Sequence, residues 1–118
     1  MNNNDIFPKR GEIWLVSFDP SVGTEIKKIR PALILSNNIA NKKTTKICVV
    51  PLTSNVKNIG LVVIVEPDKE NNLKVPGLIR VPDINTFDKS RIKNKIGALS
   101  SEKLKEVEKK LKLHLGFN

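Results

Sequence analysis

Short apolar runs separated by turn-forming residues occupy most of the first hundred positions of the chain. Six runs stand out, at residues 12–18, 31–36, 47–52, 61–65, 78–81 and, more weakly, 95–98. Glycine, proline, asparagine, aspartate or serine bounds each run, a punctuation that is typical of β-strands. The pattern therefore predicts six short strands.

The first four runs are apolar on both faces. That pattern fits either a parallel sheet covered by helices or a small closed barrel. Parallel neighbours need a long crossover, usually a helix, and most gaps between these runs are too short to hold one. We therefore predict a mainly β fold, either a curled antiparallel sheet or a small barrel.

The end of the chain changes to a helical period. Apolar residues recur at spacings of three and four, at Leu104, Val107, Leu111 and Leu115. Ser100 or Ser101 precedes them as a candidate N-cap, so we predict a C-terminal helix with one apolar stripe. A shorter helical turn is expected after Asn37 or Asn38.

Composition adds a strong positive charge to this picture. The 118 residues fit a single domain over 1–118, with 39% hydrophobic and 28% charged residues. Lysine and arginine number 21 against 12 acidic residues, which gives a net charge of +9. Such a charge attracts polyanions or an acidic protein, although a lysine-rich surface with no specific partner has the same composition.

Several classes of chemistry are disfavoured. The single cysteine, Cys48, excludes an intrachain disulfide, and the single histidine, His114, excludes a two-histidine acid–base pair. No acidic, histidine or cysteine cluster has metal-ligand spacing, and no phosphate-binding loop or nucleophile elbow occurs, so we predict neither a metal nor a cofactor. The polar N-terminus and the lack of about 18 consecutive apolar residues predict a cytoplasmic protein with no membrane contact.

Polar residues at the predicted strand ends remain as candidates for chemistry: Arg30, Thr53, Ser54, Arg80 and Asp83. An RNA strand brings its own nucleophile, the 2′-hydroxyl, so a protein needs mainly to move protons and to stabilise charge on phosphorus. Guanidinium groups and hydroxyl donors suit that last task. Taken alone, however, such residues at strand ends are more often structural.

Four blocks resemble, in order, segments of the MazF/PemK toxin family. They are Arg-Gly-Glu-Ile-Trp at 10–14, Asp-Pro-Ser-Val-Gly-Thr-Glu at 19–25, Arg-Pro-Ala-Leu-Ile-Leu-Ser-Asn at 30–37 and Val-Pro-Leu-Thr-Ser at 50–54. Thr-Phe-Asp-Lys at 86–89 and the terminal helix continue the match along nearly the whole chain. Four blocks in register make the resemblance specific.

The resemblance implies an SH3-like barrel with a C-terminal helix that acts as a homodimer. It also implies sequence-specific, metal-independent cleavage of single-stranded mRNA, leaving a 2′,3′-cyclic phosphate and a 5′-hydroxyl. The protein would then be the toxin of a type II toxin–antitoxin system that inhibits translation and growth. An acidic, partly disordered antitoxin would wrap its basic surface.

Residue by residue, the resemblance assigns catalysis to Arg30, at the scissile phosphate, and to Thr53 as its hydrogen-bonding partner. Ser54 is a second candidate. Glu25, in the long connection between the first two strands, is a candidate for binding substrate or for acting as the base. Lys27 and Lys28 of the same connection are expected to bind RNA.

One departure from the family pattern concerns the fifth strand. Some relatives carry Arg-x-Asp there, whereas this chain reads Arg80-Val81-Pro82-Asp83. A shift of one residue in a strand turns the side chain to the other face, so Asp83 remains a candidate for catalysis or RNA binding only if a bulge restores its direction. Asn85 also replaces a frequent arginine, which leaves Arg80 as the expected RNA ligand of this region.

Two other functions remain open at this point. One is a barrel that binds nucleic acid without cleaving it. The other is a gyrase-poisoning toxin of the CcdB kind, which depends on an aromatic–glycine–aliphatic C-terminus. The tail here reads Leu115-Gly116-Phe117-Asn118 and departs from that pattern.

Overall fold

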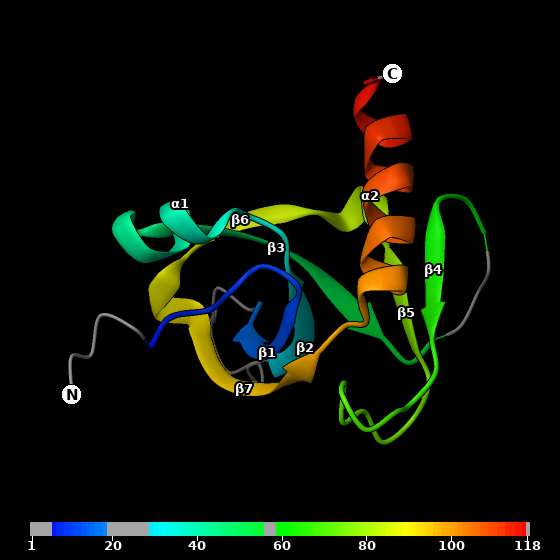
Figure 1. The fold of residues 1–118 in the computed structure, drawn as a ribbon, viewed down its shortest axis with the longest axis horizontal. Helices are drawn as coiled ribbons and strands as arrows, with labels where there is room; N and C mark the ends of the chain where they lie inside the picture. Colours follow the sequence, from blue (N-terminus) through cyan, green and yellow to red (C-terminus); the bar gives the residue numbers. More distant parts are fainter. Residues whose placement is uncertain (1–5, 19–28, 56–58, 118) are drawn as a thin grey trace, which may run out of the picture.

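The computed structural model describes residues 6–18, 29–55 and 59–117, and they form an antiparallel sheet with a C-terminal helix (Figure 1). The elements follow in the order β1 (Glu12–Ser17), β2 (Ile29–Ile34), α1 (Asn38–Lys43), β3 (Lys46–Thr53), β4 (Val62–Val65), β5 (Gly77–Arg80), η2 (Val81–Asp83), β6 (Asn85–Asp88), η3 (Lys89–Arg91), β7 (Ile92–Ala98) and α2 (Ser101–Leu115). None of the helices in these ranges is long and apolar enough to span a bilayer.

The six predicted strands and both predicted helices are confirmed. Asn37 caps α1 by accepting a hydrogen bond from the Ala40 amide at 2.8 Å, and Ser100 caps α2 by accepting from the Lys103 amide at 3.2 Å. The sequence pattern missed β6, which reads Asn-Thr-Phe-Asp. This strand forms because it pairs with residues 46–49 of β3, a tertiary contact that overrides its weak local propensity.

The sheet is curled but not closed, which confirms the predicted mainly antiparallel fold with a C-terminal helix, and the word barrel describes it only loosely. The strand order is β4-β5-β3-β2-β1-β7, with β6 beside β3. The long strand β3 pairs with β2 along one edge and with β6 and then β5 along the other. Within the part of the chain that the structure describes, the ladder ends at β4 and β7 and no pairing joins these two strands.

A loop, residues 66–76, lies along β7 and is hydrogen-bonded to it. The Ala98 amide donates to the Glu70 carbonyl at 2.9 Å, and Asn72 Nδ2 donates to the Ile96 carbonyl at 2.9 Å. The backbones approach so closely that a Cβ on Gly97 would lie 2.3 Å from the Glu70 carbonyl oxygen. Glycine is therefore required at this position of β7 for the loop to sit where it does.

Both faces of the central strands are buried, as their apolar sequences predict. Leu33 and Val50 belong to a core that α2 covers through the fully buried Val107. Ala32 and Val49 face the opposite side and belong to a second core. The predicted stripe of α2 holds for Leu104, Val107 and Leu111, whereas Leu115 is 49% exposed because the last turns of the helix extend beyond the sheet (Figure 1).

Candidate active site

The ends of β2 and β3 place Arg30 and Thr53 beside each other. Ala32 pairs with Pro51 in the antiparallel register, and continuing that register by two residues sets Arg30 opposite Thr53. Directly opposite residues of an antiparallel pair point to the same face of the sheet. Arg30 is exposed and Thr53 is half-buried, so the two side chains share one accessible face.

Arg80 joins the same face from the other edge of β3. Thr53 pairs with Leu78 of β5, and continuing this register places Arg80 opposite Pro51. Pro51 and Thr53 are two residues apart in β3 and therefore point to the same side. Two guanidinium groups thus flank the C-terminal end of β3 on a single face.

Asp83 also lines this site, and a 3₁₀ turn rather than a bulge brings it there. The strand β5 stops at Arg80, and the chain turns through the 3₁₀ helix η2, with Pro82 in its first turn. Side chains three residues apart eclipse in a 3₁₀ turn. Asp83 Oδ2 consequently lies 3.3 Å from Arg80 Nε. The turn therefore brings the Asp83 side chain to the same side as Arg80 without a bulge.

These residues line one open pocket of about 800 Å³. Its lining includes all five predicted site residues that the structure describes, namely Arg30, Thr53, Ser54, Arg80 and Asp83. Residues 73–77, at the end of the loop and the start of β5, form a further wall. Glu25, Lys27 and Lys28 lie outside the described residues.

The pocket carries more positive than negative charge. Arg30, Lys74 and Arg80 line it as cations, and Asp83 is its carboxylate within the described ranges. Thr53 Oγ1 accepts a hydrogen bond from the Asn55 amide at 3.1 Å, which fixes the hydroxyl while leaving its proton able to donate into the pocket. Guanidinium forks with a hydroxyl donor form a suitable environment for a phosphodiester.

Residues 73–77 of the pocket lining were not predicted from the sequence. They belong to a polar loop and to the start of β5, and Lys74 is the charged member. No motif or spacing marks Lys74, because its relation to Arg30 exists only after the sheet has folded. Its nearness to β5 in the sequence was the one available hint.

The two residues that first suggest nucleophilic or acid–base chemistry lie elsewhere. Cys48 of β3 is half-buried, and burial raises the pKa of its thiol, which keeps it protonated and unreactive. His114 is exposed in the last turn of α2. Across residues 6–18, 29–55 and 59–117, no three histidine, cysteine, aspartate or glutamate side chains gather as metal ligands.

Comparison with known proteins gives consistent matches over nearly the full length. Residues 9–115 match the family described as "PemK-like, MazF-like toxin of type II toxin-antitoxin system". "Endoribonuclease MazF9" of Mycobacterium tuberculosis is 34% identical over 112 residues, which cover 91% of this chain and 95% of that protein.

Solved structures show the same fold. A MazE–MazF crystal structure (Form-II) from Deinococcus radiodurans superposes with a TM-score of 0.83 at 29% identity, covering 97% of this chain and 100% of that one. An endoribonuclease in complex with its cognate antitoxin, from a mycobacterial species, gives a TM-score of 0.76 at 25% identity, with coverage of 94% and 97%.

Proposed function

Because the chain belongs to the family of PemK-like, MazF-like toxins of type II toxin–antitoxin systems, we propose that it is an endoribonuclease that cleaves single-stranded mRNA at specific short sequences. The relative at 34% identity carries the name endoribonuclease. The observation that most supports the proposal is the pocket in which Arg30 and Thr53 meet. An enzyme of this kind needs a phosphate site with donors aimed at the reacting phosphorus.

In the proposed reaction the 2′-hydroxyl of the RNA attacks the adjacent phosphorus without a metal ion. The 2′-oxygen loses its proton and forms the new bond to phosphorus, and the bond to the 5′-oxygen breaks. That oxygen takes up a proton, which leaves a 2′,3′-cyclic phosphate and a 5′-hydroxyl. Arg30 stabilises the additional charge on the phosphate oxygens, and Thr53 donates its hydroxyl to the same group.

The remaining residues support this step in defined ways. Arg80 binds the phosphate backbone, and Asp83 holds the Arg80 guanidinium through the contact at 3.3 Å. Arginine is a poor proton carrier because its pKa exceeds about 12, so the proton transfers fall to other groups. Ser54 at the pocket edge is a further hydrogen-bond donor, and Glu25 is the candidate base from the preceding connection.

As a toxin, the protein would stop translation in the cytoplasm by cutting mRNA, and an antitoxin would restrain it. The structural neighbours include MazF with MazE and an endoribonuclease with its cognate antitoxin. The net charge of +9 suits an acidic antitoxin that covers the same surface as the RNA. We propose that the active form is a homodimer.

Incubation of the purified protein with a long single-stranded RNA in excess EDTA tests the proposal. Cleavage at a few short motifs, with cyclic-phosphate ends, is the expected result. Bound but intact RNA would instead identify a non-catalytic nucleic-acid-binding protein. Trapped gyrase–DNA complexes in a parallel assay would identify the CcdB-like alternative.

Arg30→Ala should lower the cleavage rate by at least about 10²–10³-fold, the typical cost of losing one donor to a developing oxyanion. Arg30 is exposed, so the variant should unfold at the same temperature as the wild type and still bind the antitoxin. Lys105→Ala on the exposed surface of α2 serves as the matched loss of one cation. Full activity of Arg30→Ala would refute the mechanism.

A further inference from the structure

The loop at residues 66–76 has an internal scaffold of side-chain hydrogen bonds. Asn71 is 1% exposed, and its Nδ2 donates to the Glu66 carbonyl at 2.9 Å. Its Oδ1 accepts from the amides of Asp68, at 3.0 Å, and Leu73, at 2.9 Å. Asp68 Oδ1 in turn accepts from the amides of Glu70 and Asn71. A buried amide side chain that makes three hydrogen bonds within one loop fixes the conformation of that loop.

The same loop is anchored to the body of the protein on two sides. Asn72 adopts a left-handed backbone with φ of 56°, and its side chain donates to the Ile96 carbonyl of β7. Leu73 packs against the main core. Gly97 admits the Glu70 carbonyl against the strand. The loop is thus held in one position against β7 and the main core.

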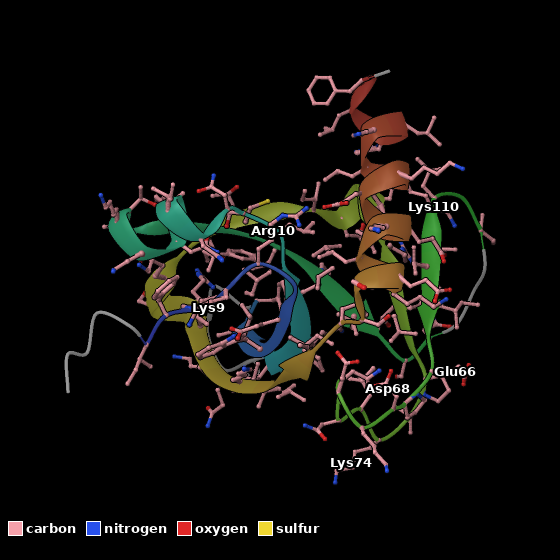
Figure 2. All side chains as sticks on the ribbon, in the orientation of Figure 1. Lys9, Arg10, Glu66, Asp68, Lys74 and Lys110 are labelled. Carbon is pink, nitrogen blue, oxygen red and sulfur yellow. The ribbon has the colours of Figure 1, made fainter. Side chains whose placement is uncertain are left out.

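This scaffold ends at the active-site pocket. Leu73, whose amide Asn71 binds, is followed directly by Lys74, and both line the pocket that Arg30 and Thr53 also line. Figure 2 shows Lys74 at the outer turn of the loop, beyond Glu66 and Asp68. The ammonium group is exposed on a long stem, and it is the third cation around a pocket whose carboxylate already contacts Arg80.

We propose that residues 73–77 form the second wall of the RNA site, that Lys74 binds a backbone phosphate next to the scissile one, and that Asn71 is a positioning residue for Lys74. This inference rests on the proposed ribonuclease function. Arg30 and Thr53 act where the bond breaks, on the β2–β3 side of the pocket. Lys74 comes from a different segment of the lining, the end of the loop at residues 66–76, and contacts a phosphate outside the reacting group. That contact exists equally before and during the reaction and therefore strengthens binding rather than the chemical step.

The test measures kcat and KM on a short RNA that contains one cleavage motif. Lys74→Ala should raise KM by about tenfold with kcat nearly unchanged, the pattern for an interaction equal in ground and transition states. The dependence of log KM on log salt should flatten by about 0.7, the value for one phosphate contact on single-stranded RNA. Lys74→Arg should restore both, and Lys69→Ala, in the same loop but away from the pocket, should match the wild type.

Asn71→Ala should raise KM in the same way although Asn71 is buried in the loop scaffold. Added to Lys74→Ala it should change KM little further, because the two substitutions remove one function. If Asn71 had a merely structural role, Asn71→Ala would instead reduce the amount of folded protein, which circular dichroism would record, and would lower the apparent kcat. Its effect would then add to that of Lys74→Ala.

The outcomes separate the two claims. If the wild type leaves the RNA intact, the proposed function and this inference both fail. If the wild type cleaves but Lys74→Ala keeps its KM and salt dependence, this inference alone fails. If Lys74→Ala lowers kcat while KM stays constant, Lys74 acts in the chemical step and the assigned role is wrong.

Discussion

Glu12 is the polar residue with the most contacts on β1, and its ionisation is tied to the fold. Its side chain is 13% exposed and accepts hydrogen bonds from the Lys9 amide at 2.8 Å and from Trp14 Nε1 at 2.9 Å. Lys95 Nζ lies 2.8 Å from its second oxygen. Burial acts to raise the pKa of Glu12, but the bonds from Lys95, Lys9 and Trp14 together outweigh it, and the pKa falls below the ordinary 4.5.

A lowered pKa means that Glu12 stabilises the fold in its charged form. This stabilisation is complete above the unfolded pKa and is lost as the pH falls through the lower, folded value. Glu12→Gln should therefore reduce the free energy of unfolding by about 1–2 kcal/mol at neutral pH and by progressively less on acidification. Urea denaturation at pH 7 and at about pH 3 measures this difference.

Glu66→Gln is the matched control for this charge. Glu66 is exposed, and it accepts the hydrogen bond from Asn71 through its backbone carbonyl, so the substitution should be neutral at both pH values. A cost for Glu12→Gln that is equal at neutral and acidic pH would contradict the ionic role of Glu12.

At the scale of elements, the sequence predicts whatever depends on local pattern. Apolar runs identified β1 to β5 and β7, and the serine before a helical period identified the start of α2. The strand β6 was missed because its pairing partner, and not its own composition, makes it a strand. The 3₁₀ turn η2 was also missed, because Pro82 shows that the strand ends but does not show which turn follows it.

The candidate site shows the same division. Arg30, Thr53 and Arg80 were found from strand ends and family blocks, and their convergence follows from the register of β2, β3 and β5. The wall at residues 73–77 was not found, because its loop is held by a hydrogen bond to a strand residue 24 positions away in the sequence. Long-range backbone contacts of that kind leave no periodic signal in the sequence.

The helix α2 offers a test of which contacts hold an element in place. Val107 is fully buried in the main core, whereas Leu113 is 62% exposed although it is the larger residue. Val107→Ala should lower the free energy of unfolding by about 2 kcal/mol, since it leaves a cavity between α2 and the sheet. Leu113→Ala should change it by less than about 0.5 kcal/mol.

Thermal and urea unfolding of both variants, at equal protein concentration, measure this contrast. The smaller truncation is expected to have the larger effect. Equal costs would show that the exposed end of α2 is buried by another copy of the chain in solution, because only burial makes Leu113 contribute.

At the scale of the whole molecule, positive charge extends well beyond the pocket. Residues 42–46 and 88–93 hold six basic residues and one acidic residue, Asp88, at the far end of β3 from Thr53. Bonds from Ser90, together with Lys46 and Arg91, lower the pKa of Asp88, so the aspartate remains charged among these cations. The net field therefore draws RNA toward several surfaces, and attraction alone does not identify the residues in contact with it.

The salt dependence of RNA binding distinguishes lysines that contact a phosphate directly from lysines that act only through the overall positive charge of the protein. Each phosphate that a cation neutralises on single-stranded RNA contributes about 0.7 to the slope of log affinity against log salt. Lys27 and Lys28 are predicted from the sequence to bind the RNA, so replacing both with alanine in an Arg30→Ala background should flatten that slope by about 1.4. Lys112→Ala, near the end of α2 that extends from the sheet, removes charge without a predicted contact and should weaken binding slightly at constant slope (Figure 1). An unchanged slope for the double variant would mean that these lysines act only through the field of the molecule, and that the phosphate contacts are made by the pocket itself.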